Sequence, residues 1–114
     1  MRRRADNSVW RGMRIAARSG CFSCHAAPHG QEVANPGSPF GTVPSFAGAN
    51  LRMYVDRPEE VAEWVREGHT EKLEDDAKAW AVYRAQTIQM PPFEDRLSDS
   101  EVSAVVAYVL AADG

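Results

Sequence analysis

The chain has 114 residues and a formal net charge of −3, and 44% of its residues are hydrophobic and 25% charged. This length suits one domain, residues 1–114, and the composition argues against a disordered chain, collagen or a disulfide-packed mini-protein. No apolar run approaches the ~20 residues that cross a bilayer, which argues against an integral membrane protein. The acidic balance argues against a nucleic-acid-binding protein.

Charge is distributed unevenly along the chain. Residues 1–18 hold six arginines and one acid, whereas residues 56–76 hold nine acids and three bases. Such an asymmetry can orient a charged partner, but solvated helix faces with a basic terminus are the simpler interpretation. Residues 1–6 lack the apolar run of a signal peptide, so we expect a flexible basic arm or linker there. We further expect that an export signal was removed or replaced, or that the chain is a piece of a longer protein.

The first half of the chain predicts a helix, a loop and a short helix. The first helix is capped among residues 6–8 and ends at Gly20. Its expected apolar face consists of Val9, Met13, Ala16 and Ala17. Residues 26–48 hold most of the proline and glycine and predict a long ordered loop. A short helix is expected at residues 51–54.

The second half predicts three further helices. The first begins near Asp56 with Pro58 in its first turn and ends at Gly68. Its apolar stripe is Val61, Trp64 and Val65. A helix over residues 74–86 is expected to turn Ala77, Trp80, Ala81 and Tyr83 inward. Pro91 and Pro92 then require an extended segment.

The last predicted helix has the clearest signals. Ser98 and Glu101 form the capping-box pattern S-x-x-E at its start. Apolar residues then recur with a period of 3.6, which predicts a helix despite the many valines. The expected buried face is Val102, Val105, Val106, Val109 and Leu110.

The two cysteines of the chain lie in one motif, C-x-x-C-H, at Cys21, Cys24 and His25. This pattern is typical of covalent attachment of a c-type haem. Two thiols about one helical turn apart reach the vinyl groups on one haem edge, and the next residue points an imidazole at the iron. One motif without a spare cysteine predicts one haem.

Two other interpretations of the motif stay open. A thioredoxin-type dithiol would require a βαβ context, whereas this chain predicts helices throughout. A zinc half-site would need further ligands, for which His29 and His69 are available at spacings unlike those of zinc modules. Either would make the chain a colourless cytosolic protein.

The flanks of the motif resemble the class I cytochrome c family over residues 12–110, with the segments in the family's order. Phe46 stands where leucine is commoner, and residues 28–43 and 69–87 are regions that vary across the family. The matching segments are Gly12-Met13-Arg14-Ile15, Pro44-Ser45-Phe46-Ala47-Gly48, residues 63–68, Met90-Pro91-Pro92-Phe93, Leu97-Ser98-Asp99 and residues 105–108.

The resemblance implies an all-α, class I cytochrome c fold, with about four to five helices around one haem c bound through Cys21 and Cys24. It implies that His25 is the proximal iron ligand and donates its other ring N–H to the carbonyl of Pro44. It implies Met90 as the sixth ligand, and an aromatic residue of the last helix packed on the glycine of the first. The other implied pocket residues are Phe46 and Trp64.

Rivals for the sixth position are His69 and His29, because imidazole binds ferric haem well. Met13 and Met53 are interpreted as core residues. Six side chains can line the pocket or pair with a haem propionate; Trp64 is favoured among the aromatic ones by its place in the matched helix, and the sequence does not choose among the arginines. The six are Trp64, Trp80, Tyr83, Arg52, Arg57 and Arg84.

The function that the resemblance implies is single-electron transfer between redox proteins, by a carrier rather than an enzyme. With both axial positions filled, the iron has no open site for a substrate. Alternatives are an electron-transfer domain or subunit of a larger redox enzyme, and a haem sensor or peroxidase-like domain with a displaceable sixth ligand. We expect a monomeric domain, with no nucleic acid as a partner and with a membrane or larger complex as a further association. Because this motif is loaded with haem outside the cytoplasmic membrane, we expect the bacterial periplasm or the outer face of that membrane.

Overall fold

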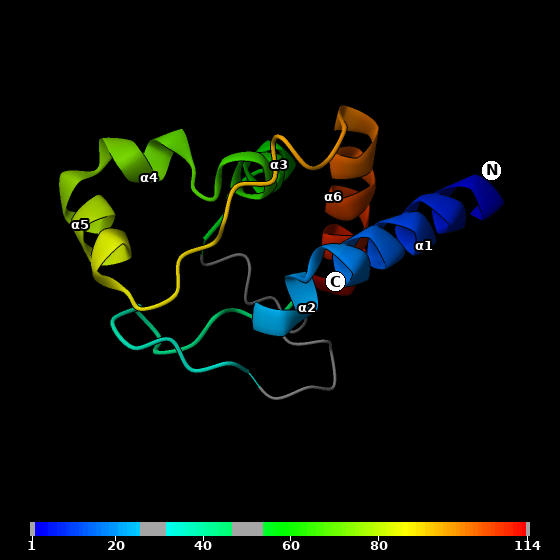
Figure 1. Cartoon of the computed structure of the whole chain (residues 1–114). Helices are drawn as coiled ribbons and strands as arrows, with labels where there is room; N and C mark the ends of the chain where they lie inside the picture. The colour runs from blue at the N-terminus through cyan, green and yellow to red at the C-terminus, as the bar shows by residue number, and fades with distance from the viewer. Residues whose placement is uncertain (1, 26–31, 47–53, 114) are drawn as a thin grey trace.

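A computed structural model describes residues 2–25, 32–46 and 54–113 (Figure 1). The regular secondary structure of the described residues consists of helices, and their β-structure is one isolated bridge between Ala34 and Thr42. The predicted all-α class is therefore confirmed. The expectations for His29, Arg52 and Met53 lie outside the described residues. The helices are α1 (Arg2–Ser19), α2 (Cys21–Cys24), α3 (Pro58–Glu67), α4 (Glu71–Asp75), α5 (Ala77–Ala85) and α6 (Asp99–Asp113).

The helices fall into two groups. Figure 1 shows α1 and α6 crossing on one side and α4 and α5 on the other, with residues 86–97 running between the groups past α3. The backbone N–H of Phe93 donates to the carbonyl of Val65 at 3.0 Å, and that of Glu94 donates to Arg66 at 3.1 Å. These bonds join the connecting segment to α3. No helix in the described ranges is long and apolar enough to cross a membrane.

The crossing of α1 and α6 depends on Gly12. A Cβ at this position would overlap the backbone carbonyl of Ala104 and press on the Cβ of Tyr108. The two helices therefore approach at backbone distance, and the aromatic residue of the last helix packs on the glycine of the first. Around the crossing lies the apolar core, which includes Ile15, Ala16, Val102, Val105 and Val109.

The first helix differs from its prediction at its start and on its buried face. It begins at Arg2 rather than at a cap among residues 6–8, so the segment expected as an arm continues the helix, and its role as an arm or linker stays a prediction. Ile15 is buried, whereas Ala17, expected inside, is exposed. Because Gly12 must face α6, the side of α1 that carries Gly12 and Ile15 is buried, and Ala17 lies on the solvent side.

The boundaries of α3 agree with the sequence signals. Pro58 occupies the first turn, and Gly68 ends the helix with φ 80°, a left-handed conformation that glycine adopts without strain. Val61 and Val65 are buried as predicted. Glu60 is buried as well, which the apolar pattern did not indicate.

The helix expected over residues 74–86 is present in part, because α5 spans Ala77–Ala85 but the chain is not one continuous helix. Two short helices are separated at Asp76, whose side chain accepts a hydrogen bond from Ala79 N–H at 3.1 Å and so caps α5. Tyr83 is buried and Trp80 half-buried, but Ala77 and Ala81 are exposed. Because α5 begins anew at this cap, its buried face is not a continuation of the face of α4. A pattern of apolar residues read as one helix therefore predicts the wrong buried residues.

The last helix has the predicted capping box. Ser98 N–H donates to the Glu101 carboxylate at 2.8 Å, and Glu101 N–H donates to the Ser98 hydroxyl at 3.2 Å. Leu110 was expected inside but is 41% exposed. It lies on the solvent side of α6 with Ser103 and Ala111, whereas its neighbour Val109 is buried. The short helix expected at residues 51–54 is absent at its one described residue, Tyr54, which lies in a turn.

Candidate functional site

The C-x-x-C-H motif lies at the turn between α1 and the loop that follows. Gly20, with φ 87°, ends α1, and the single turn of α2 begins directly with Cys21 and ends with Cys24. Both cysteines are free thiols and half-buried. His25 leaves the turn in an extended conformation while its N–H still donates to the Cys21 carbonyl at 2.8 Å. The motif therefore sets two thiols one turn apart, with an imidazole directly behind them.

The His25 ring is fixed by the carbonyl of Pro44. Nδ1 lies 2.7 Å from this oxygen. Since a carbonyl only accepts, Nδ1 must carry the proton, and in the neutral ring Nε2 keeps its lone pair. Burial lowers the pKa of His25, and the bond to Pro44 opposes this shift. A neutral imidazole with a held orientation is what a metal ion requires of a histidine ligand.

Aromatic rings surround the imidazole on one side. Phe46 stacks on His25 with ring centroids 4.8 Å apart. Phe22 and Tyr108 each meet Phe46 edge-on, at 5.9 and 6.0 Å. Phe46 is thereby held between α2 and α6, and it restricts the tilt of the imidazole.

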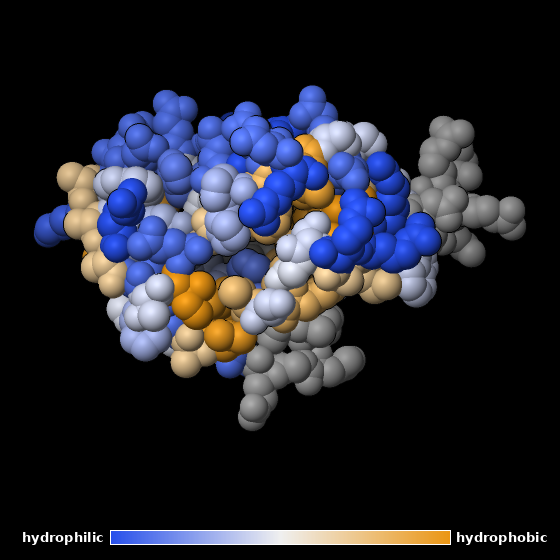
Figure 2. Space-filling model, viewed as in Figure 1, coloured by the Kyte–Doolittle hydropathy of each residue, from blue (hydrophilic) through white to orange (hydrophobic). Residues whose placement is uncertain are grey.

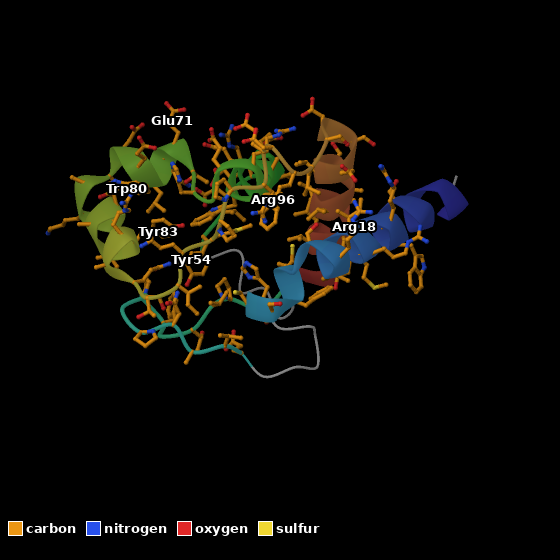
Figure 3. The ribbon with its side chains drawn as sticks, viewed as in Figure 1. Arg18, Tyr54, Glu71, Trp80, Tyr83 and Arg96 are labelled. Carbon is orange, nitrogen blue, oxygen red and sulfur yellow. The ribbon has the colours of Figure 1, made fainter. Side chains whose placement is uncertain are left out.

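The indole N–H of Trp64 is buried and has no hydrogen-bond partner within the described part of the chain. An unpaired buried donor costs free energy, so such atoms usually mark a missing partner. Tyr83 contacts the indole at 5.7 Å between ring centroids, and Figure 3 shows Tyr83 beside Trp80 on α5. Trp64 thus offers one donor for which the described residues supply no acceptor.

Met90 lies half-buried against the apolar core. Its backbone faces the hydroxyl of Tyr83 and opposes the rise that burial causes in the pKa of Tyr83, while this hydroxyl donates to the carbonyl of Gly68 at 2.6 Å. A Cβ on Gly68 would overlap the carbonyl of Met90. The end of α3, the buried face of α5 and the Met90 segment therefore meet at one point.

Other residues proposed from the sequence contact protein groups instead. His69 pairs with Glu74 at 2.8 Å and lies against Trp80 at 4.8 Å between ring centroids. The Arg57 guanidinium lies 3.6 Å from the Glu60 carboxylate. Arg84 lies over the Trp80 ring at 5.6 Å. None of these contacts brings His69, Arg57 or Arg84 to the motif.

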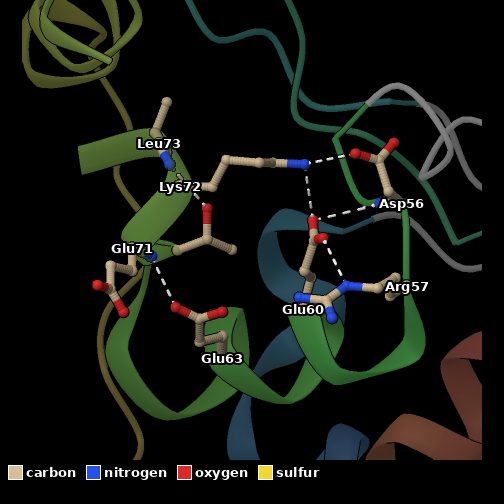
Figure 4. Close-up of polar contacts among 8 residues, drawn as sticks. Asp56, Arg57, Glu60, Glu63, Glu71, Lys72 and Leu73 are labelled. Atoms are coloured by element: carbon tan, nitrogen blue, oxygen red, sulfur yellow. Dashed lines mark hydrogen bonds and ion pairs between the residues drawn. The ribbon is translucent and has the colours of Figure 1, made fainter. Parts of the chain in front are cut away.

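A hollow of about 340 Å³ lies between α3 and α4. Every residue that lines it is charged, including Glu60 and Lys72, and Figure 4 shows the ion pairs across it. A porphyrin needs a mostly apolar pocket, so this hollow does not suit one. The face in Figure 2 is also hollowed near its centre, and hydrophobic side chains border that hollow.

The structure bears on the two other interpretations of the cysteines. Among the described residues no three His, Cys, Asp or Glu side chains are grouped to hold one metal ion. Burial raises the pKa of Cys21, whereas a reactive dithiol requires a lowered one. Neither a zinc site nor a redox dithiol gains support from this geometry.

One residue of the site region was missed from the sequence. Asn35 is buried and hydrogen-bonds through its side chain to the backbone of Ile88, two residues before Met90. Nothing local distinguishes it from the other polar residues of a proline-rich loop. Only the approach of a segment 53 residues away gives it this role.

The residues and their order agree with a comparison against known families. The model of the family described as "Cytochrome c" matches residues 9–113. No curated protein and no solved structure matches the chain. The family match spans the C-x-x-C-H turn, α3, the Met90 segment and α6, so the chain belongs to the cytochrome c family.

Proposed function

We propose that the chain is a single-haem electron carrier, with haem attached at Cys21 and Cys24 and its iron held between His25 and Met90. Members of the cytochrome c family carry covalent haem and transfer electrons. When bound, haem supplies an iron that gains and loses one electron. The protein's part is to attach it, orient the ligands and exclude water.

The observation that carries the proposal is the contact between His25 and Pro44. The bond at 2.7 Å keeps the proton on Nδ1 and turns Nε2 away from the carbonyl as a free donor to iron. The same turn of helix holds both thiols. A dithiol or a buried structural histidine would not need this combination.

Two further features support the fit of a haem. The orphan N–H of Trp64 suits a porphyrin carboxylate or another acceptor at the pocket wall. Phe46 and Met90 both pack in the apolar core cluster. An apolar surface with few polar groups is the kind of lining that a haem pocket requires.

The proposed ligation sets the electronic role of the chain. The Met90 thioether is a soft ligand that favours reduced iron and raises the reduction potential. Because Pro44 and Tyr83 hold the two ligand segments, little rearranges when the charge changes. With His25 and Met90 both holding the iron, no site would be left for a substrate, and the chain would act as a carrier and not as an enzyme.

The test is the optical spectrum of the haem-loaded ferric protein. We expect the weak far-red band of sulfur bound to ferric iron, and we expect Met90→Ala to abolish it. Met13→Ala is the matched control, since Met13 is a half-buried methionine on α1, and it should keep the band. A wild-type spectrum without the band contradicts the proposed ligation and favours the sensor or peroxidase-like alternative, as does ready binding of carbon monoxide to the reduced protein.

Location and partners follow from the same proposal. Haem attachment to C-x-x-C-H takes place outside the cytoplasmic membrane, so we propose the periplasm or the outer face of the bacterial cytoplasmic membrane as the site of action. Redox proteins are the proposed partners, either as separate molecules or as other parts of a larger enzyme. Detection of the haem-bearing chain in a periplasmic fraction, and not in the cytoplasm, tests the location.

A further inference from the structure

Asn35 brackets a single peptide position in the segment that leads to Met90. Its Oδ1 accepts from Ile88 N–H at 2.7 Å, and its Nδ2 donates to the Ile88 carbonyl at 3.0 Å. Asn35 thus engages both backbone groups of Ile88, as a neighbouring strand would. The Ile88 carbonyl also accepts from Gln86 Nε2 at 2.9 Å, whereas Asn35 is the partner of the Ile88 N–H. Asn35 is 3% exposed, so water does not compete freely for these bonds.

The loop that carries Asn35 is itself braced. Asn35 N–H donates to the Gly41 carbonyl at 2.7 Å, and Val43 N–H donates to Val33 at 2.9 Å. The loop also holds the segment through its backbone, since the Pro36 carbonyl accepts from Thr87 N–H at 2.9 Å. The amide of Asn35 therefore acts from a fixed platform on residues 87 and 88.

On its other side, the Met90 segment is anchored to α3 and α5. The Met90 backbone faces the Tyr83 hydroxyl, and Phe93 N–H donates to the Val65 carbonyl at 3.0 Å. Met90 thus lies between the bonds at residues 87 and 88 and those at Phe93 and Glu94. We expect loss of the bonds at Ile88 to loosen the side of the segment that leads to Met90 without unfolding any helix.

We propose that Asn35 is a positioning residue that keeps the Met90 side chain in place as an iron ligand. This inference rests on the proposed ligation by Met90. A thioether is a weak ligand for ferric iron, so a competing imidazole displaces it easily once its loop is free. The two bonds to Ile88 add their free energy to the closed position of the loop and so oppose displacement.

The test measures imidazole binding to the haem-loaded ferric protein by optical titration. Asn35→Ala removes both bonds to Ile88, and we expect imidazole to bind on the order of ten-fold more tightly, with a weaker far-red band. Ser38→Ala is the matched control, because Ser38 lies in the same loop and its hydroxyl donates within that loop to Thr42, at 3.4 Å. The control should bind imidazole as the wild type does.

A second measurement uses the wild-type protein alone, in case Asn35→Ala does not fold. Coupling between two events is reciprocal, so displacement of Met90 by saturating imidazole should weaken the bond between Asn35 and Ile88. We expect hydrogen exchange at the Ile88 amide to accelerate at least ten-fold, whereas the Val102 amide in α6 should not change.

Each outcome decides one of the two claims. If the wild type shows the far-red band but Asn35→Ala binds imidazole with unchanged affinity, the role of Asn35 is wrong and the proposed ligation stands. If saturating imidazole leaves hydrogen exchange at the Ile88 amide of the wild type unchanged, the role of Asn35 is likewise wrong. If the wild type lacks the band, the ligation itself is wrong.

Discussion

The hydroxyl of Tyr83 on α5 donates a hydrogen bond to the Gly68 carbonyl at the end of α3, across 2.6 Å. The same oxygen faces the backbone of Met90, which opposes the rise that burial causes in the pKa of Tyr83. One phenol therefore joins two helices to the segment of the proposed sixth ligand. The left-handed turn at Gly68 makes this possible, because it turns the carbonyl toward α5 and leaves room for Met90.

Tyr83→Phe removes this link and retains the ring. We expect the free energy of unfolding to fall by about 1–2 kcal/mol, because the buried Gly68 carbonyl loses its donor. The far-red band should weaken as the Met90 segment loosens. Denaturant unfolding and the ferric spectrum measure the two effects.

Tyr108→Phe is the control for this substitution. Its ring also lies in the apolar core, but no hydrogen bond of its hydroxyl is present among the described residues. We expect a change within about 0.5 kcal/mol. Equal losses for the two variants would show that the Tyr83 hydroxyl has no special role.

Gly12→Ala tests the backbone contact between α1 and α6. Alanine is the better helix former by about 1 kcal/mol, so propensity alone predicts a gain. The added methyl group would meet the Ala104 carbonyl, which cannot move without shifting α6. We expect a net loss of about 3 kcal/mol, seen in denaturant unfolding.

Ala17→Gly supplies the matched control on the same helix. Ala17 is exposed, so only the propensity term applies, and we expect a loss of about 1 kcal/mol. If Gly12→Ala stabilises the protein, α1 and α6 do not meet as closely as the structure shows.

Local signals explain which parts of the fold were predictable. Pro58, Gly68 and the Ser98–Glu101 box act through their own backbone, so they mark helix ends wherever the rest of the chain lies. The C-x-x-C-H turn is equally local, since Cys21 and Cys24 need only one turn of helix. These helix ends depend on few neighbours and are confirmed, whereas haem attachment at the two cysteines stays a prediction.

The errors arise where distant contacts decide. Ala17 and Leu110 are apolar and in helical register. The close approach at Gly12 selects a different face of α1, and Leu110 lies on the solvent side of α6, next to the buried Val109. The apolar pattern places Asp76 inside one helix, whereas its side chain caps α5 and so separates α5 from α4. Asn35 shows the limit most clearly, because its partner Ile88 is 53 residues away and no pattern in the loop points to it.

A buried carboxylate between α3 and α4 gives a third prediction. Glu60 has a side chain 5% exposed and lies 3.1 Å from Lys72 and 3.6 Å from Arg57 (Figure 4). Burial alone would raise the pKa of Glu60, but the Asp56 N–H and Lys72 outweigh it and hold that pKa below its usual value. The carboxylate thus stays charged and relies on its partners.

Lys72→Met removes one partner and leaves the charge. We expect a lower melting temperature than for the wild type, and a partial recovery when Glu60→Gln is added, because the uncompensated buried charge is then gone. Lys78→Met, at an exposed lysine on α5, is the control and should melt near the wild type. If the double variant melts below Lys72→Met, Glu60 does not depend on this lysine.

The capping box of α6 gives a dependence of stability on pH. The Ser98 N–H, and then Arg18 at 2.6 Å, hold the pKa of Glu101 below its usual value of 4.5. A depressed carboxyl pKa means that folding favours the charged form. The stability contributed by this group is therefore complete above pH 4.5 and is lost as the pH falls through the lower, folded-state value.

Glu101→Gln keeps an oxygen for the Ser98 N–H but removes the charge. We expect the variant to be less stable than the wild type at pH 7, and this difference to shrink as the pH falls below 4.5, because the wild-type carboxylate then becomes protonated. Urea unfolding of the haem-loaded protein across this range measures it. Arg18→Gln removes the ion pair between Arg18 and Glu101 but keeps the capping box. We expect the difference in stability between this variant and the wild type to change less with pH than the difference for Glu101→Gln. A gap between wild type and Glu101→Gln that stays constant with pH would mean that the carboxylate acts as a hydrogen-bond acceptor alone, without a contribution from its charge.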